Sequence, residues 1–137
     1  MSMTVYISGP ISGIANRNAF AFDDAAIGIK TEFLGLCCCE VINPVLIGEQ
    51  VDKSFAGAGR VLAVDAQPGW QDYMRACIRE LTRATHIYML PGWEKSRGAT
   101  VEKELAEKLG IKVCYSLGDL RKSCRDSAAD GYWEAGK

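Results

Sequence analysis

Residues 4–13, TVYISGPISG, place a short apolar run directly before a loop that contains glycine and proline. The run TVYIS (4–8) predicts a strand, and GPISG (9–13) predicts a tight loop after it. From about Asn18 to Leu36, apolar residues recur at intervals of three and four, which predicts a helix with one face packed on a sheet. The residues of that face are Ala19, Phe22, Ala26, Ile29 and Phe33. A strand, a loop and a helix in this order are typical of parallel β/α folds.

The same alternation continues along the chain. CCCEVI (37–42) predicts a second strand, which Asn43 and Pro44 end, because proline cannot donate a hydrogen bond to a neighbouring strand. Residues 47–68 contain several glycines and little periodicity, so we expect a long loop there. The other predicted elements are a helix over 70–84, a strand over 86–90, a helix that ends at Leu109 before Gly110, a strand over 111–115 and a short helix near 118–124.

This order of elements predicts one α/β domain over residues 1–125 and a polar tail over 126–137. The domain is expected to be a doubly wound, Rossmann-like parallel sheet of four to five strands in flavodoxin-like order, with helices on both faces. In such sheets ligands bind at the carboxyl ends of the strands, near the point where the strand order reverses. The loops after the strands are therefore expected to line the functional site.

Charge and hydropathy exclude several classes of protein. The 137 residues carry 16 basic and 17 acidic side chains, and the formal charge of -1 gives no basic field that would attract nucleic acid or anionic lipid. No apolar run approaches the ~20 residues that span a bilayer, and the N-terminus lacks the pattern of a secretion signal. We therefore expect a cytoplasmic protein whose partners include neither a nucleic acid nor a membrane.

The six cysteines predict neither a disulfide framework nor a metal site. None forms a C-x-x-C pair, and the single histidine, His86, opens a predicted strand and is interpreted as structural. Buried thiols in a reducing cytosol are the better interpretation of Cys37, Cys38, Cys39, Cys77, Cys114 and Cys124. No histidine is left for the triad of an acyl-transfer enzyme.

PGWEKSRGATVEKEL (91–105) contains three glutamates in different settings. Glu104 is expected to face solvent and Glu94 to lie in a loop, whereas Glu102 begins the apolar stripe of a helix. That stripe continues through Leu105, Ala106 and Leu109. A carboxylate in a first helical turn beside the loops would be partly desolvated, and the helix dipole would favour its ionised form, as a nucleophile requires. The alternative is that Glu102 only caps its own helix.

Two loops have the composition of a phosphate cradle. Ser96 and Gly98 precede a helix, and glycine lets backbone N–H groups approach an anion while a hydroxyl adds a donor. GPISG (9–13) offers the same ingredients after the neighbouring strand. Glycine and serine also occur in ordinary turns, so each loop alone has a purely conformational interpretation.

Three aromatic residues are further candidates. Tyr6 lies near the end of the first strand, where its phenol could reach a carboxylate, although a core aromatic with a satisfied hydroxyl is the alternative. Trp70 and Trp93 flank the predicted crevice and are suited either to stacking on a base or to packing.

The chain resembles a domain-of-unknown-function family that is frequent in phages and prophages. Four segments match the landmarks of that family in order, and they are VYISGPISG, VINP, WQDYMRACI and MLPGWEKSRGATVEKELAEKLGIKV. That family is similar to the nucleoside 2-deoxyribosyltransferase superfamily, and the likeness runs from about Thr4 to Val113. The superfamily's nucleotide hydrolase branch has the spacing S-x-G-x-x-x-E, which Ser96, Gly98 and Glu102 match.

The resemblance implies a function. Glu102 would attack the anomeric carbon of a 2'-deoxynucleoside 5'-monophosphate, and Tyr6 would orient it, so that the base is released to water or exchanged. The 5'-phosphate would be held by Ile11, Ser12, Gly13, Ser96 and Gly98, and the matching segments add Gly9, Asn43 and Trp93 as binding candidates. The resemblance implies no metal and no organic cofactor, and it implies a homodimer or a larger homo-oligomer. An acidic residue in the place of Ser96 would suit a free nucleoside, so Ser96 favours the monophosphate.

One departure from the family pattern concerns the acid that protonates the leaving base. Family members carry an aspartate five residues after the position of Asp72, where this chain has Cys77, and a thiol is a poor acid for this step. Either Asp72 or Glu94 replaces it, or the reaction is slow, or the protein is a nucleotide-binding module without catalysis. A further alternative is a phosphoribohydrolase of the cytokinin-activating type. Such enzymes have the motif PGG-x-GT-x-x-E, and the segment PGWEKSRGATVE of this chain distantly resembles it.

Overall fold

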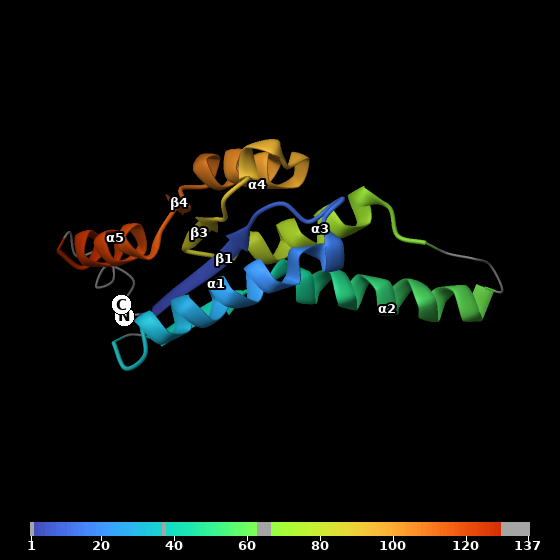
Figure 1. The fold of residues 1–137 in the computed structure, drawn as a ribbon, viewed down its shortest axis with the longest axis horizontal. Helices are drawn as coiled ribbons and strands as arrows, with labels where there is room; N and C mark the ends of the chain where they lie inside the picture. Colours follow the sequence, from blue (N-terminus) through green and yellow to red (C-terminus); the bar gives the residue numbers. More distant parts are fainter. Residues whose placement is uncertain (1, 37, 63–66, 130–137) are drawn as a thin grey trace.

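The computed structural model describes residues 2–36, 38–62 and 67–129, and its centre is a parallel sheet (Figure 1). The four strands are β1 (Ser2–Ser8), β2 (Cys38–Ile42), β3 (His86–Met89) and β4 (Lys112–Cys114), and they lie in the order β2-β1-β3-β4. Every pairing in the sheet is parallel. The predicted α/β fold with flavodoxin-like strand order is confirmed, and the strand order reverses between β1 and β3.

Helices connect the strands. They are α1 (Ala19–Glu32), α2 (Pro44–Leu62), α3 (Trp70–Leu81), α4 (Arg97–Lys108) and α5 (Leu117–Ala129), with short 3-10 turns η1 (Ala15–Asn18) and η2 (Trp93–Lys95). Gly110 follows α4 with a φ of 76°, a conformation that glycine adopts without strain, so the predicted end of this helix is confirmed. α5 extends past its predicted end into the segment predicted as a tail. Residues 37, 63–66 and 130–137, which the predictions also cover, lie outside the described residues.

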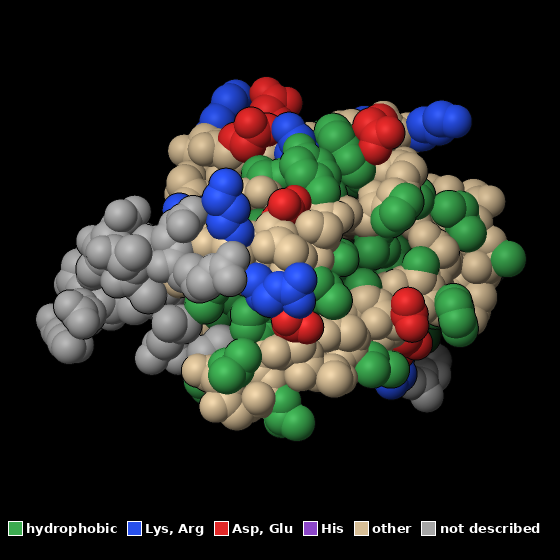
Figure 2. All heavy atoms as spheres, turned by 60° about the vertical axis from the view of Figure 1, so that its left-hand side comes forward, with side chains coloured by type: hydrophobic (Ala, Val, Ile, Leu, Met, Phe, Trp, Pro, Cys, Tyr) green, Lys and Arg blue, Asp and Glu red, His purple; other side chains and the backbone are tan. Residues whose placement is uncertain are grey.

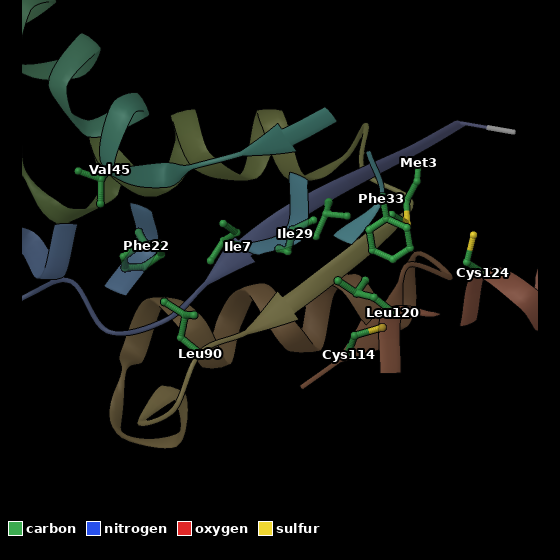
Figure 3. Packing of buried hydrophobic residues seen from close by; sticks show 11 residues of the cluster. Met3, Ile7, Phe22, Ile29, Phe33, Val45, Leu90, Cys114, Leu120 and Cys124 are labelled. Atoms are coloured by element: carbon green, nitrogen blue, oxygen red, sulfur yellow. The ribbon is translucent and has the colours of Figure 1, made fainter. Parts of the chain in front are cut away.

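The side chains of β1 alternate between two apolar clusters, as a strand covered on both faces requires. Met3, Val5 and Ile7 pack with residues of α1 and α5. Figure 3 shows Ile7 between Phe22 and Ile29, and Met3 beside Phe33. Tyr6 points to the opposite face, where α3 and α4 pack on the sheet. This second face carries the functional site described below.

The prediction of a loop over 47–68 is wrong for most of its length, because α2 runs from Pro44 to Leu62. Asn43 precedes the helix, and its side-chain oxygen accepts a hydrogen bond from the Val45 backbone N–H at 3.0 Å. Pro44 then occupies the first helical position, where its missing N–H has no consequence. The glycines of this segment lower its helix propensity without preventing the helix, which reaches past the end of the sheet (Figure 1).

Basic and acidic side chains are interspersed on the face shown in Figure 2. Neither sign gathers into a continuous patch there, which fits the nearly balanced composition. Within the described part of the chain, no helix combines the length and the hydrophobicity needed to cross a membrane.

Candidate functional site

A cavity of about 420 Å³ lies at the carboxyl end of β1, on the side of the sheet that carries α3 and α4. The loop after β1 forms one wall, and the N-terminal parts of α2, α3 and α4 form the others. It is lined by Gly9, Ile11, Ser12, Gly13, Ile14, Arg17, Pro44, Val45, Gly48, Trp70, Tyr73, Met74, Cys77, Ser96, Gly98, Ala99 and Glu102. This is the position where ligands bind in doubly wound sheets.

Glu102 is the only carboxylate among the described residues that line the cavity, and its side chain is 5% exposed. Glu102 therefore lies on the buried side of α4, as its place in the apolar stripe predicts. Its position along the helix differs from the prediction, because α4 begins at Arg97 and Glu102 lies in the second turn. The effect of the helix dipole falls off within the first turn, so it contributes little to the ionisation of Glu102.

Two hydroxyls donate hydrogen bonds to the Glu102 carboxylate, one to each oxygen. The Tyr6 hydroxyl donates to Oε2, and Ser8 Oγ donates to Oε1 at 2.7 Å. Both side chains come from β1, where residues two apart point to the same face of the sheet. Ser8 is fully buried, and sequence reasoning missed it although its spacing from Tyr6 was a usable signal.

Burial dominates the ionisation of this cluster. It raises the pKa of Glu102 to about 7, while the hydrogen bonds from Tyr6 and Ser8 act in the opposite direction. The expectation of a carboxylate favoured in its ionised form therefore fails, since desolvation outweighs the donors. At neutral pH this group is divided between a carboxylate and a carboxylic acid.

Cys77 lines the cavity from α3, beside Tyr6 and Glu102. Burial, followed by the charge of Glu102, raises the pKa of its thiol to about 12, so the thiol stays protonated at physiological pH. The Cys77 side chain is therefore a neutral and weak acid.

The structure brings the predicted phosphate-binding residues together around the cavity. Gly9, Ile11, Ser12 and Gly13 line it from the loop after β1, and Ser96 and Gly98 line it from the start of α4. Ser96 also caps α4, because its Oγ accepts a hydrogen bond from the Ala99 backbone N–H at 3.2 Å. These residues come from two separate segments, as the prediction of adjacent loops requires.

Four other candidates do not line the cavity. Asp72 accepts a hydrogen bond from the Gly69 backbone N–H at 2.8 Å and so caps α3. Trp93 lies near Tyr115 and packs against the edge of the apolar cluster that contains Tyr6. Asn43 caps α2, and its amide donates to Asp23 Oδ1 at 2.9 Å. Glu94 lies in η2 and is exposed, so neither proposed replacement for the missing acid reaches the cavity.

Sequence reasoning also missed a charged cluster at the cavity. Arg17 Nη2 lies 2.6 Å from Asp52 Oδ2, and the Tyr73 hydroxyl donates to Asp52 Oδ1 at 2.5 Å. Hydrogen bonds from Tyr73 and Arg17 hold the pKa of Asp52 below its usual value. Gly48 makes room for the guanidinium, since a Cβ there would lie 2.9 Å from Arg17 Nη1. No sequence signal links these residues, because they come from η1, α2 and α3.

Arg17 is the only Lys or Arg among the described residues that line the cavity. Its Nε and Nη1 make no hydrogen bond to any described residue, so donors remain for an anion. Trp70 lines the cavity as well, and the Arg97 guanidinium lies 3.8 Å from the centre of its ring. In the described residues no group of histidine, cysteine or acidic side chains could hold a metal ion.

A protein-family model described as "Domain of unknown function (DUF4406)" matches residues 3–115. The chain belongs to this family. The DUF4406 region contains all of the sheet except Ser2 and every residue that lines the cavity, so the site is part of the family domain. No curated protein and no solved structure matches the chain significantly.

Proposed function

We propose that this protein cleaves or exchanges the N-glycosidic bond of a 2'-deoxynucleoside 5'-monophosphate, with Glu102 as the nucleophile. The observation that carries the proposal is a buried carboxylate, held at both oxygens by Tyr6 and Ser8, that lines a cavity. A nucleophile needs this combination of fixed orientation and partial desolvation. The likeness of PGWEKSRGATVE to the superfamily motif supports the same residue.

The reaction is a double displacement at C1'. In the first step a Glu102 oxygen forms an ester bond to C1', the C1'–N bond breaks, and the bonding electrons leave with the base. In the second step water attacks C1' and loses one proton to solvent, while the bond between C1' and the Glu102 oxygen breaks, which returns the carboxylate and releases deoxyribose 5-phosphate. The departed base takes up one proton from solvent, so the two steps together consume one water. A second base in place of water gives exchange instead of hydrolysis.

The cavity walls support a phosphorylated substrate. Arg17 supplies a positive charge, and the start of α4 at Ser96 and Gly98 supplies donors of the kind that bind phosphate. Trp70 offers a flat apolar face for the base. The weak point of the site is the acid for the leaving base, because Cys77 has a pKa of about 12. We therefore expect slow turnover with bases that are poor leaving groups.

The test is release of free base from deoxynucleoside monophosphates, followed by chromatography. Glu102→Ala should abolish release, whereas the matched control Glu104→Ala should leave it unchanged, because Glu104 is exposed and, among the described residues, forms an ion pair only with Lys108. Mass spectrometry of the quenched wild type should detect a deoxyribosyl phosphate adduct on Glu102. Undiminished turnover in Glu102→Ala would refute the proposal.

The second candidate is a nucleotide-binding module without catalysis. It is favoured by the absence of a second carboxylate among the described residues that line the cavity. Binding of dAMP without release of adenine would support this candidate. Parallel assays with AMP address the phosphoribohydrolase alternative, which requires that the site tolerate the ribose 2'-hydroxyl.

A further inference from the structure

The turn η1 contains three consecutive residues with a left-handed backbone. Asn16, Arg17 and Asn18 have φ values of 53°, 55° and 59°, a region that side chains rarely adopt. Asparagine tolerates this region better than most residues do, whereas arginine has no such advantage. A strained conformation persists only where the surrounding structure holds it, and strain of this kind is concentrated at ligand sites. The side-chain contacts of Arg17 therefore help to keep this turn in place.

The guanidinium of Arg17 is held by side chains of α2 and α3. Asp52 Oδ2 lies 2.6 Å from Nη2, and the same nitrogen donates to the Tyr73 hydroxyl at 3.3 Å. The Tyr73 hydroxyl donates in turn to Asp52 Oδ1 at 2.5 Å, so the three groups form a closed network. Hydrogen bonds from Tyr73 and Arg17 keep the pKa of Asp52 below its usual value, so its carboxylate stays charged at neutral pH.

Gly48 completes the seat of Arg17, which we define as Gly48, Asp52 and Tyr73. A Cβ at Gly48 would lie 2.9 Å from Arg17 Nη1, a separation that the two atoms could not keep. Gly48 lies inside α2, where alanine would favour the helix more, and its backbone is not in the left-handed region. The helix therefore gives no reason for a glycine at this position, whereas the guanidinium does.

The seat fixes one side of the guanidinium and leaves the rest available to a ligand. Its contacts occupy Nη2, whereas Nε and Nη1 make no hydrogen bond to any described residue. A long side chain that is already fixed loses less conformational freedom when it binds a ligand. Asp52 does not line the cavity, so its charge orients Arg17 without facing a bound phosphate directly.

We propose that Gly48, Asp52 and Tyr73 are positioning residues that make the site selective for a 5'-phosphate over a free 5'-hydroxyl. They act through Arg17, whose guanidinium they hold at the cavity wall. This inference rests on the proposed function, because it takes a 2'-deoxynucleoside 5'-monophosphate as the ligand.

The test is isothermal titration calorimetry with dAMP and with deoxyadenosine, in Glu102→Gln to prevent turnover. Adding Gly48→Ala changes no charge and suits the helix, but its methyl group displaces the guanidinium. The dissociation constant of dAMP should rise about tenfold, as for the loss of a hydrogen bond to a charged group, and that of deoxyadenosine less than about twofold. Gly57→Ala is the matched control, because a Cβ there meets no atom of a described residue within 4 Å of it.

A double-mutant cycle shows whether the seat acts through Arg17. In an Arg17→Gln background, Gly48→Ala should no longer change the affinity for dAMP, since glutamine is too short to meet the added methyl group. A purely steric effect on the ligand would persist in that background and would weaken both ligands. Tyr73→Phe keeps the ring and removes the bridging hydroxyl, so it should also weaken dAMP binding only where Arg17 is present.

The outcomes separate this inference from the proposed function. If Gly48→Ala and Gly57→Ala had the same preference for dAMP over deoxyadenosine, the inference would be overturned and the proposed function would stand. The same holds if Gly48→Ala had an equal effect with and without Arg17. If neither the wild type nor Glu102→Gln bound dAMP, the proposed function would fail, and this inference with it.

Discussion

Glu102 is a carboxyl group that is almost completely removed from water and yet has a hydrogen-bond donor at each oxygen. The two effects oppose each other, since burial penalises the charge and the donors stabilise it. Burial prevails, and the pKa rises from 4.5 to about 7. The group can therefore change its charge near neutral pH, which makes both stability and activity depend on pH.

Stability should fall as pH rises through this range. A glutamate with a raised folded-state pKa binds its proton more tightly in the folded chain, so its contribution is fully present below pH 4.5 and is lost as pH passes about 7. The shift corresponds to on the order of 3 kcal/mol. Urea unfolding of wild type and Glu102→Gln at pH 5 and pH 8 should show the wild type losing stability relative to the variant. An equal difference at both pH values would contradict the assignment.

Tyr6→Phe should reduce kcat by about tenfold to a hundredfold, because a hydrogen bond to a charged group contributes roughly 1.5–3 kcal/mol. In the wild type the hydrogen bond from Tyr6 lowers the pKa of Glu102, so its loss should raise that pKa. A shift of the pH-rate profile to higher pH is therefore a second readout. Tyr88→Phe removes a hydroxyl from the opposite side of the sheet and should change neither quantity. A Tyr6→Phe profile that coincides with the wild type would exclude this role.

The identity of the buried glutamate could be predicted from the sequence, but its pKa could not. Glu102 shares a helical face with apolar residues, and that spacing is visible in one short segment. The pKa depends on Tyr6, Ser8 and the packing of α3, which are distant in sequence. For Trp93 the sequence left open whether the ring stacks on a base or packs, and the structure places it outside the residues that line the cavity.

At the scale of elements, α2 shows how composition can mislead. Its glycines favoured a loop, whereas Asn43 and Pro44 are a cap and a first-turn residue that start a helix. The same dipeptide was interpreted only as the end of a strand. Local capping chemistry decided the structure here, and α2 then supplies Gly48 and Asp52 to the cavity and its charged cluster.

Asn43→Ala should destabilise the protein by about 1–2 kcal/mol, since it removes the cap of α2 and the hydrogen bond to Asp23. Asn43→Ser should recover part of this loss, because serine is also a good cap. Thermal unfolding followed by circular dichroism measures both variants. Equal destabilisation by alanine and serine would show that the cap contributes nothing.

At the scale of the whole molecule, the strand order places the site. β1 is central and buried, its end meets the reversal of strand order, and segments from Gly9 to Glu102 converge there. This position followed from the alternation of strands and helices in the sequence. The contribution of Arg17 did not, because it depends on how η1, α2 and α3 pack against one another.

Because the cavity joins segments from most of the chain, a ligand bound there should stabilise the entire fold. In Glu102→Gln, which cannot turn over substrate by the proposed route, dAMP at a hundred times its dissociation constant should add about 2.7 kcal/mol. For a chain of this size that raises Tm by roughly 10 °C.

Adding Arg17→Gln should remove most of the shift with dAMP and little of the shift with deoxyadenosine, because only dAMP carries the phosphate. Arg75→Gln removes an equal charge outside the cavity and is the control. If Arg17→Gln and Arg75→Gln gave equal shifts with dAMP, Arg17 would have no part in phosphate recognition.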